Sequence, residues 1–138
     1  MSSKVGHVLL DRDGVLNVES EGVPVGSADC WQWERGALEG LAMLGAHGVA
    51  VSIVTNQSCV GRGHVSRAAV DNVHGWLAGQ LAELRVSLLG IYVCPHAPWD
   101  GCGCRKPRPG LLHEAILASG ERPEHSAMVG DSASDLQA

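Results

Sequence analysis

The sequence predicts an α/β fold, a three-layer sandwich in which helices cover both faces of a mostly parallel central sheet. Short apolar runs alternate along the chain with longer segments of helical periodicity, and this alternation predicts right-handed crossovers between parallel strands. The chain has 138 residues and is 45% hydrophobic, enough for the core of one domain of ordinary size. The sequence contains no internal repeat, low-complexity tract or linker, so we expect a single domain over residues 1–138.

The first strand is expected at residues 7–10, an apolar run that ends in an acidic pair. A helix follows over residues 36–48, because apolar residues recur there at helical spacing and Gly48 can end the last turn. Residues 49–54 predict the second strand. Ser66 can cap a longer helix that runs to about Leu84 and carries one apolar stripe: Ala69, Val73, Trp76, Leu77 and Leu81.

The third strand leads into Cys94, a third helix is expected from Leu111 to about Ser119, and residues 126–129 predict the fourth strand. Residues 19–33 form the one long irregular segment. We expect this segment to fold over the mouth of a site or to pack Trp31 and Trp33 against the domain. Core packing is the more common role of such tryptophans.

Three cysteines and a histidine gather after the third strand. Sulfur and nitrogen donors at the spacings C-x-H and C-x-C can converge on one ion, and Zn²⁺ is the usual occupant of such a site. Four protein ligands leave no position for water, so we expect a structural zinc that folds this Gly- and Pro-rich loop and thereby orients Arg105 and Lys106. The expected ligands are Cys94, His96, Cys102 and Cys104.

The five cysteines are an odd number, and three of them have metal-ligand spacing, so a disulfide framework is the weaker interpretation. The two remaining cysteines are Cys30 and Cys59. We expect both to be packed or partly buried thiols.

Two carboxylates emerge together at the end of the first strand, in Asp11-Arg12-Asp13-Gly14, where the glycine allows a tight turn. Neighbouring anions are costly unless a cation or a shared proton compensates, and such hard oxygen ligands suit Mg²⁺. The fourth strand also ends in an acid, Asp131, with Asp135 one helical turn further on. A Ca²⁺ loop would need further ligands and a terminal Glu that are missing here, and Asp131 taken alone would be a helix cap.

Chemically capable residues therefore end all four strands: Asp11 and Asp13, Thr55, the Cys94/His96 loop with Lys106, and Asp131. Ligands of open parallel sheets bind at the carboxyl ends of the strands, so we expect these segments to meet in one crevice. An aspartate nucleophile, a second aspartate that gives and takes a proton, a Thr and a Lys that hold phosphoryl oxygens, and an aspartate that binds Mg²⁺ together describe phosphoryl transfer through an aspartyl-phosphate.

Four motifs occur in the order of the haloacid dehalogenase superfamily: Asp11-x-Asp13-Gly14, Thr55-Asn56-Gln57, Arg105-Lys106-Pro107 and Gly130-Asp131-Ser132-x-x-Asp135. Together with the Cys/His loop, they make the chain similar over nearly its whole length to the zinc-containing branch of heptose-bisphosphate and histidinol-phosphate phosphatases. The resemblance implies a Rossmann-like fold with a small cap or none, and both Mg²⁺ and Zn²⁺ as cofactors.

The resemblance also implies a role for each motif residue. Asp11 would be the nucleophile, Asp13 the general acid and base, and Thr55 and Lys106 the phosphate ligands. Asp131 would bind Mg²⁺ together with Asp11 and the main-chain carbonyl of Asp13, and Asp135 would contribute less. Further candidates for substrate contact are Asn17, Asn56, Arg62 and Arg105, although Asn17, Asn56 and Gln57 are more often turn-stabilising amides.

Within this branch, residues 11–17, 55–63 and 104–110 resemble the heptose enzymes, which implies D-glycero-D-manno-heptose 1,7-bisphosphate as substrate. The short segment between His96 and Cys102 is more like the histidinol-phosphate enzymes. Cys59 stands where the heptose enzymes usually carry Gly, so we expect the turn after Gln57 to differ slightly. Superfamily members continue past the point where this sequence ends, so we expect the domain to lack the usual C-terminal helix and strand.

The net charge of −5 argues against nucleic acid as a partner, because binding to a nucleic acid backbone needs a basic face. The sequence shows no run long enough to span a membrane and no signal-peptide region, so a cytoplasmic location is expected, as a monomer or weak homo-oligomer. The basic residues near the expected crevice suit a small phosphorylated metabolite, with Lys106 on the cleaved phosphate and guanidinium groups on the distal one. They are Arg62, Arg67, Arg105, Lys106 and Arg108.

Other functions stay open at the level of the sequence. A polynucleotide 3′-phosphatase shares three of the motifs but lacks the Cys/His loop and prefers a basic surface. A phosphotransferase or mutase could use the same aspartate pair, although the small lid makes water the expected acceptor. A non-catalytic, zinc-stabilised binding protein is the alternative from a different class.

Overall fold

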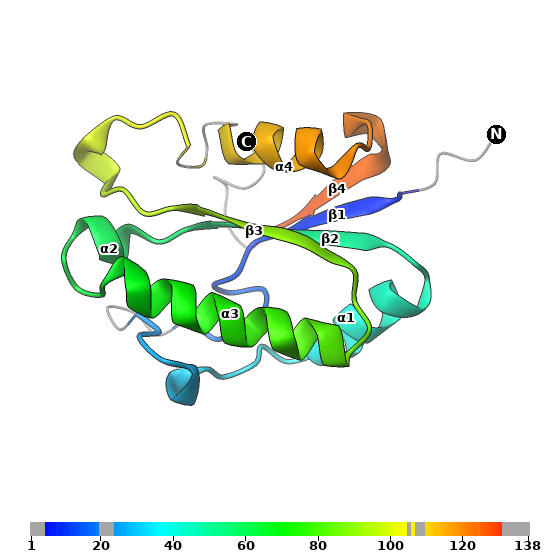
Figure 1. Cartoon of the computed structure of the whole chain (residues 1–138), viewed down its shortest axis with the longest axis horizontal. Helices are drawn as coiled ribbons and strands as arrows, with labels where there is room; N and C mark the ends of the chain where they lie inside the picture. The colour runs from blue at the N-terminus through cyan, green and yellow to red at the C-terminus, as the bar shows by residue number, and fades with distance from the viewer. Residues whose placement is uncertain (1–4, 20–23, 105, 107–109, 131–138) are drawn as a thin grey trace.

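The structure is a computed structural model and describes residues 5–19, 24–104, 106 and 110–130. Four parallel strands form one sheet in the order β3-β2-β1-β4 (Figure 1). They are β1 (His7–Leu10), β2 (Ala50–Asn56), β3 (Leu88–Cys94) and β4 (Ser126–Val129). The predicted α/β class with a parallel sheet is confirmed.

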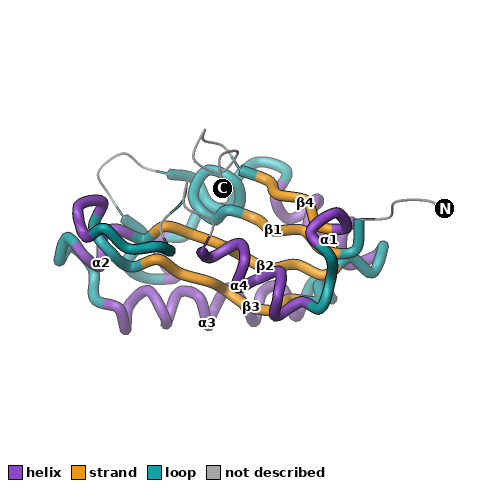
Figure 2. The backbone as a smooth tube through the Cα atoms, turned by 90° about the horizontal axis from the view of Figure 1, so that it is seen from above, coloured by secondary structure: helices purple, strands orange, loops and turns teal. Residues whose placement is uncertain are grey.

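Helices cover both faces of this sheet. In Figure 1, α1 (Ala37–Ala46) and α3 (Arg67–Glu83) lie below the sheet and α4 (Gly110–Ser119) lies above it. Figure 2, a view from above, shows α4 lying over β2 and β3. The remaining elements are short: α2 (Ser58–Gly61), η1 (Ala28–Cys30), η2 (Pro98–Asp100) and η3 (Pro123–His125). In the described part of the segment between β1 and α1, η1 is the one helical turn, consistent with a small cap or none.

The ends of the long helices follow the predicted signals. The hydroxyl of Ser66 accepts a hydrogen bond from the backbone N–H of Ala69 at 3.0 Å and caps α3. Gly48 follows α1 with a φ of +68°, a left-handed conformation that glycine adopts without a steric cost and that ends the helix.

One feature after β2 differs from the prediction. The strand itself ends in hydroxyl and amide residues as expected, with Thr55 paired to Val93 and Asn56 to Cys94. The short helix α2 then begins at Ser58, where a turn was expected. Cys59 lies inside α2 with an ordinary negative φ, so this position does not require glycine.

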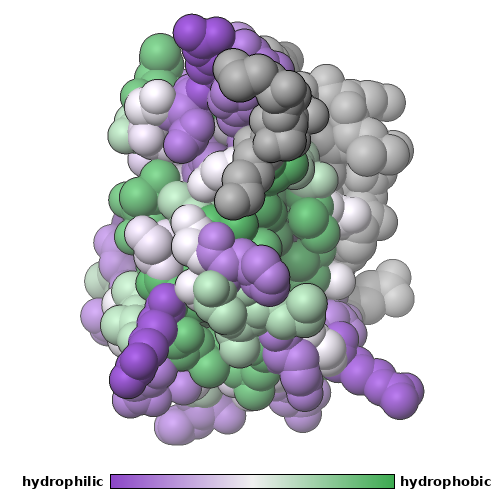
Figure 3. Space-filling model, turned by 90° about the vertical axis from the view of Figure 1, so that its right-hand side faces the viewer, coloured by the Kyte–Doolittle hydropathy of each residue, from purple (hydrophilic) through white to green (hydrophobic). Residues whose placement is uncertain are grey.

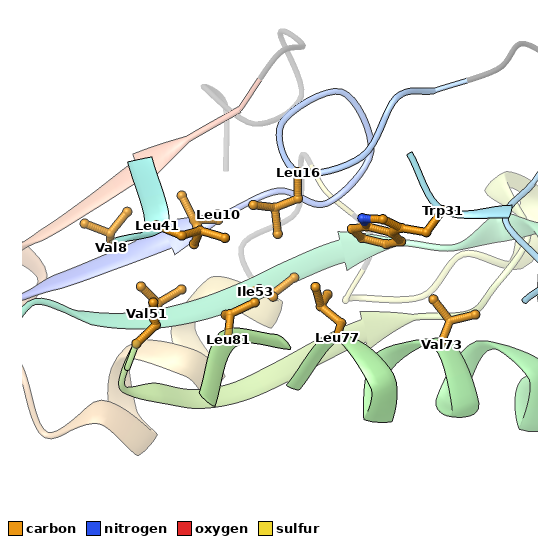
Figure 4. Packing of buried hydrophobic residues seen from close by; sticks show 11 residues of the cluster. Val8, Leu10, Leu16, Trp31, Leu41, Val51, Ile53, Val73, Leu77 and Leu81 are labelled. Carbon is orange, nitrogen blue, oxygen red and sulfur yellow. The ribbon is translucent and has the colours of Figure 1, made fainter. Parts of the chain in front are cut away.

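The main core lies between the sheet and the lower helices (Figure 4). Its buried side chains come from β1, β2, α1, α3, the irregular segment and the loops after β1 and α3: Val8, Leu10, Leu16, Trp31, Leu41, Val51, Ile53, Val73, Leu77, Leu81 and Val86. Trp31 contacts Trp33 and Trp76 edge to face, with ring centroids 5.3 and 5.6 Å apart. The prediction that the irregular segment packs its tryptophans against the domain is confirmed.

The two leftover cysteines differ. Cys59 is buried, as predicted, whereas Cys30 is exposed, so the expectation of a packed thiol is wrong for Cys30. The reason is local: Cys30 ends η1, a 3₁₀ turn with no buried residue, while its neighbour Trp31 points into the core.

The carboxyl ends of the strands lie on the left in Figure 1, next to α2 and the loop that contains η2. Figure 3 shows the opposite end of the molecule, where hydrophobic side chains gather between hydrophilic ones. A shallow hollow of about 420 Å³ at that end is lined mainly by apolar residues and by no carboxylate: Val5, Gly6, Met43, Leu44, His47, Gly48 and Val49. Within the described residues, no helix is both long and apolar enough to cross a lipid bilayer.

Candidate active site and metal centre

Asp11 directly follows β1 at the carboxyl edge of the sheet. Its backbone N–H donates to the carbonyl of Val129 at 3.0 Å, so Asp11 lies beside the end of β4. Its Oδ1 accepts from the N–H of Arg12 at 2.8 Å and lies 3.2 Å from the ammonium of Lys106. A carboxylate and an ammonium from distant parts of the chain therefore meet at one edge of the sheet.

Lys106 is held from two sides. Its ammonium donates to the carbonyl of Val54 at 3.0 Å, and its side chain is only 2% exposed. The side-chain amide of Asn56 forms two hydrogen bonds with the backbone of Lys106. Asn56 Oδ1 accepts from the N–H of Lys106 at 3.0 Å, and Asn56 Nδ2 donates to the carbonyl of Lys106 at 3.2 Å. Asn56, a candidate for substrate contact, thus positions the lysine in this structure.

Asp13 directly precedes a tight turn at Gly14, whose φ of +83° favours glycine. Its Oδ1 accepts three hydrogen bonds, from Arg12 Nε at 3.0 Å, Arg12 Nη2 at 2.7 Å and Asn17 Nδ2 at 3.0 Å. Its Oδ2 accepts from Gln57 Nε2 at 3.1 Å. The two oxygens of this carboxylate therefore have different surroundings.

Gln57 connects Asp13 with Thr55. The same amide nitrogen that donates to Asp13 also donates to Thr55 Oγ1 at 2.9 Å, and both Thr55 and Gln57 are buried. Since the Thr55 oxygen accepts this bond, its own hydrogen remains to be donated elsewhere. Sequence reasoning treated Gln57 as a turn-stabilising amide. Its position directly after a strand that ends in Thr-Asn was the signal in the sequence that could have placed Gln57 in the site.

Arg12 and His74 also belong to the site region, although sequence reasoning gave neither a role. The guanidinium of Arg12 is 1% exposed, and its Nη1 lies 3.2 Å from Nε2 of His74 on α3. Burial and then the charge of Arg12 lower the pKa of His74 to about 4. The signal for His74 was a polar residue within the apolar stripe of α3, between Val70 and Leu77.

Four potential metal ligands converge in the loop after β3. Cys94 Sγ lies 2.9 Å from Cys104 Sγ, 3.4 Å from Cys102 Sγ and 3.5 Å from His96 Nδ1, and all four ligand atoms lie within 4.8 Å of one another. None of these thiols forms a disulfide. Burial raises the pKa of Cys94 to about 12. A metal ligand must be a thiolate, so binding of a metal here would release the proton of this thiol.

The donor set fits zinc. A tetrahedron with metal-ligand bonds of about 2.0 to 2.3 Å has edges of roughly 3.5 Å. Three separations are close to this value: His96 Nδ1 to Cys104 Sγ at 3.3 Å, Cys94 Sγ to Cys102 Sγ at 3.4 Å and Cys94 Sγ to His96 Nδ1 at 3.5 Å. Three sulfur donors and one imidazole are soft ligands that do not suit Mg²⁺. The predicted cluster can thus hold one metal ion.

Arg62 lies on the rim of the site, at the end of α2. Its guanidinium lies over the ring of Trp99 at 5.1 Å, and its Nε donates to Ser58 Oγ at 3.3 Å. Next to it, Gly61 N–H donates to the carbonyl of Pro95 at 2.7 Å. These contacts join α2 to residues 94–104, which we call the metal-binding loop for its four potential ligands, and Arg62 is exposed.

The structure brings together the described inner residues Asp11, Asp13, Thr55 and Lys106, with Asn17, Asn56 and Gln57 as hydrogen-bond partners. Three predicted site residues, Asp131, Asp135 and Arg105, lie outside the described residues.

Comparison with known proteins finds relatives that share one named activity. A profile of the family described as HAD-hydrolase-like matches residues 103–138. The D-glycero-beta-D-manno-heptose-1,7-bisphosphate 7-phosphatase of Pasteurella multocida is 39% identical over 137 residues, covering 95% of this chain and 73% of that protein. The D-glycero-alpha-D-manno-heptose-1,7-bisphosphate 7-phosphatase of Mycobacterium tuberculosis is 40% identical over 144 residues, covering 99% and 74%.

Solved structures agree with these relatives. The D,D-heptose 1,7-bisphosphate phosphatase of B. bronchiseptica, complexed with magnesium and phosphate, matches with a TM-score of 0.86 and 37% identity, over 95% of this chain and 73% of that one. A heptose 1,7-bisphosphate phosphatase of Burkholderia thailandensis matches with a TM-score of 0.61 and 29% identity, over 95% and 69%. The chain therefore belongs to the heptose-bisphosphate phosphatase family of the haloacid dehalogenase superfamily.

Proposed function

We propose that this chain hydrolyses the 7-phosphate of D-glycero-D-manno-heptose 1,7-bisphosphate through an aspartyl-phosphate on Asp11. The observation that carries the proposal is the convergence of Asp11, Asp13, Thr55 and Lys106 at the carboxyl edge of the sheet. The named activity of relatives at 34–40% identity supports the substrate. Those relatives include enzymes for both anomers, so the proposal extends to either one.

In the first step, a carboxylate oxygen of Asp11 forms a bond to phosphorus, and the bond between phosphorus and the sugar oxygen breaks. Lys106, held within 3.2 Å of Asp11, is placed to offset negative charge on the transferring phosphoryl group. The hydroxyl hydrogen of Thr55 is oriented by Gln57 to donate to a phosphoryl oxygen. Asp13 in its protonated form gives its proton to the departing sugar oxygen.

In the second step, Asp13, now a carboxylate, takes a proton from water as the water oxygen attacks the phosphorus of the aspartyl-phosphate. The bond between phosphorus and Asp11 breaks, which releases inorganic phosphate and restores the Asp11 carboxylate. Each step leaves Asp13 in the protonation state that the next step requires.

Asp11 and the main-chain carbonyl of Asp13 would supply hard oxygen ligands, which fit Mg²⁺, and we propose that Asp131 would complete the set. When bound, Mg²⁺ supplies positive charge beside the phosphoryl oxygens. The position of Asp11 beside the end of β4, the strand that leads toward residue 131, supports this set. Cys94, His96, Cys102 and Cys104 would hold a structural Zn²⁺.

We further propose that Arg62 binds the phosphate that is not cleaved. Its exposed position on the rim and its packing on Trp99 support this role, because a guanidinium held at the mouth can form two parallel hydrogen bonds to a phosphate. Arg105 and Asn17 stay candidates for substrate contact. A cytoplasmic location and a monomeric or weakly associated state stay predictions, and size-exclusion chromatography tests the second.

The test is Mg²⁺-dependent phosphate release from a panel of heptose bisphosphate, histidinol phosphate and a 3′-phosphorylated oligonucleotide. We expect the heptose bisphosphate to have the highest kcat/KM, and Asp11→Asn to abolish release. Preference for either of the other two substrates would overturn the substrate assignment while keeping the reaction class. Release from none of them, by protein with its metals bound, would favour a non-catalytic binding protein.

A further inference from the structure

Arg12, the residue between the two aspartates, has a fully buried cationic side chain. The guanidinium is 1% exposed, and Nε and Nη2 both donate to Oδ1 of Asp13, at 3.0 and 2.7 Å. Burial of a charge is costly unless the surrounding groups pair with it, so each N–H of this guanidinium needs an acceptor. Arg12 is therefore bound firmly to one oxygen of the proposed general acid.

His74 supplies a further acceptor from the opposite layer of the fold. Nη1 of Arg12 lies 3.2 Å from Nε2 of His74, which is 6% exposed on α3. Arginine is always protonated and can only donate, so Nε2 must accept, and the imidazole is neutral with its proton on Nδ1. The ring of Trp31 covers the guanidinium at 5.7 Å from its centroid.

Burial and then the charge of Arg12 lower the pKa of His74 and favour this neutral state, whereas Asp71 and Asp13 act against it. Arg12 and Asp13 act on it from the loop after β1, and Asp71 and Arg67 act on it from α3. Arg67 and Asp71 form an exposed ion pair of 3.0 Å with each other, which largely cancels their effect. The direct contact with Arg12 is left as the dominant electrostatic influence on the imidazole.

The hydrogen bonds to Asp13 give its two carboxylate oxygens different roles. Oδ1 accepts three N–H groups, from Arg12 twice and from Asn17, and has no room for a proton. Oδ2 accepts one hydrogen bond, from Gln57. A transferable proton therefore belongs on Oδ2, provided that the guanidinium keeps its orientation.

We propose that His74 is a positioning residue: by accepting the Nη1 hydrogen of Arg12, it fixes the guanidinium that holds Oδ1 of Asp13, and so directs Oδ2 toward the leaving sugar oxygen. This inference rests on the proposed function, in which Asp13 is the general acid. His74 touches no reacting atom. It acts from α3, outside every motif of the active site.

The test compares an alkyl phosphate, the heptose bisphosphate, with an aryl phosphate, p-nitrophenyl phosphate. The nitrophenolate leaves without a proton, so its kcat/KM depends little on the general acid, whereas the sugar alkoxide needs one. For His74→Leu, which removes the acceptor, we expect kcat/KM to fall about tenfold or more on the bisphosphate and less than about threefold on the aryl phosphate.

Two further variants separate positioning from general packing. His74→Gln places an amide oxygen where Nε2 lies. We expect this variant to restore most of the wild-type ratio of kcat/KM between the bisphosphate and the aryl phosphate. Val70→Ala removes methyl groups from a fully buried position on the same helix, so it should lower the melting temperature without changing the ratio of the two substrates. Equal losses on both substrates in His74→Leu, matched by Val70→Ala at similar stability, would overturn the inference.

A spectroscopic measurement tests the geometry without relying on turnover. The ¹⁵N chemical shifts of His74 at neutral pH should report a neutral ring protonated at Nδ1, and a ring protonated on both nitrogens would contradict the inference. If the wild-type protein hydrolyses neither phosphate, the proposed function fails and this inference fails with it. If the wild type is active and His74→Leu keeps the wild-type substrate ratio, only the inference fails.

Discussion

At the scale of single residues, the account depends on Asp11 as a nucleophile. Asp11→Asn keeps the shape of the side chain but replaces a carboxylate with a weakly nucleophilic amide. We expect kcat to fall by about 10⁴-fold or more, the scale of losing a covalent nucleophile. Lys106 still has the carbonyl of Val54 as a partner, so the variant should fold, and its circular dichroism spectrum should match the wild type. Wild-type turnover by this variant would remove Asp11 from that role.

Gln57 provides the second residue-scale prediction. Gln57→Met keeps the length of the side chain but removes the donor shared by Asp13 and Thr55. Because a hydrogen bond to a charged group contributes about 1.5–3 kcal/mol, we expect kcat/KM to fall by roughly 10- to 100-fold. Steady-state kinetics measure the change. An unchanged kcat/KM with intact folding would show that Gln57 orients neither group.

At the scale of elements, α2 and the metal-binding loop behave as one unit. A Cβ added at Gly61 would lie 2.3 Å from the backbone N of Ala97 and 2.8 Å from the carbonyl carbon of His96. These are backbone atoms and cannot rotate away, so Gly61→Ala should push α2 from the loop. We expect a loss of about 1–3 kcal/mol in the free energy of unfolding. We also expect a higher KM for the bisphosphate, since Arg62 would move with α2.

The matched control is Gly79→Ala on α3. Apart from the neighbouring backbone of the helix itself, no atom lies within 4 Å of the added Cβ there, and the residue is exposed within a helix. Alanine should raise the free energy of unfolding by about 0.5–1 kcal/mol. Urea unfolding of both variants checks the opposite signs. A stability of Gly61→Ala equal to that of the control would contradict the close contact between α2 and the loop.

The metal-binding loop gives a second element-scale prediction. We expect one zinc per chain by elemental analysis, and a strong chelator should lower the melting temperature, because the Cys/His cluster organises the segment around η2. Cys102→Ser should release the metal, whereas the matched variant Cys30→Ser, at an exposed cysteine outside the cluster, should retain it. Absence of zinc, with a melting temperature that ignores chelators, would refute the structural metal.

The sequence was sufficient for the layers, the parallel sheet and the convergence of the described motif residues, because each depends on local patterns: apolar runs that end in Asp11 or Thr55, and Cys94-x-His96 spacing. It was insufficient for α2, whose two ends are held by backbone hydrogen bonds from Gln57 to Cys94 and from Gly61 to Pro95. It also missed the contact of His74 with Arg12, since that contact depends on how α3 packs beneath the sheet. Cys30 and Trp31 are neighbours in sequence, yet only packing decides which of them is buried.

At the scale of the whole molecule, buried histidines link stability to pH. The pKa of His74 is lowered from 6.5 to about 4 in the folded state by burial and by Arg12. The unfolded chain therefore binds the proton more tightly, and stability is lost as the pH falls from 6.5 toward 4, by about 3 kcal/mol from this residue. Burial lowers the pKa of His7 as well, which acts in the same direction.

Urea unfolding of wild type and His74→Gln at pH 7 and pH 4.5 isolates this contribution, because loss of zinc and protonation of His7 affect both proteins alike. The wild type should lose more stability than the variant on acidification. Equal losses would mean that His74 has the same pKa in the folded and unfolded states, contrary to the effect of its burial and of Arg12.

The whole molecule is a scaffold that brings one edge of a parallel sheet, a metal-binding loop and a buried layer of polar side chains to a single aspartate. The most direct test of this account is rapid acid quenching of the Mg²⁺-loaded enzyme during turnover of the heptose bisphosphate, followed by mass spectrometry of its peptides. We predict one phosphoryl group on the peptide that contains Asp11, absent in Asp11→Asn. Rapid phosphate release without a phosphorylated Asp11 peptide would contradict the account.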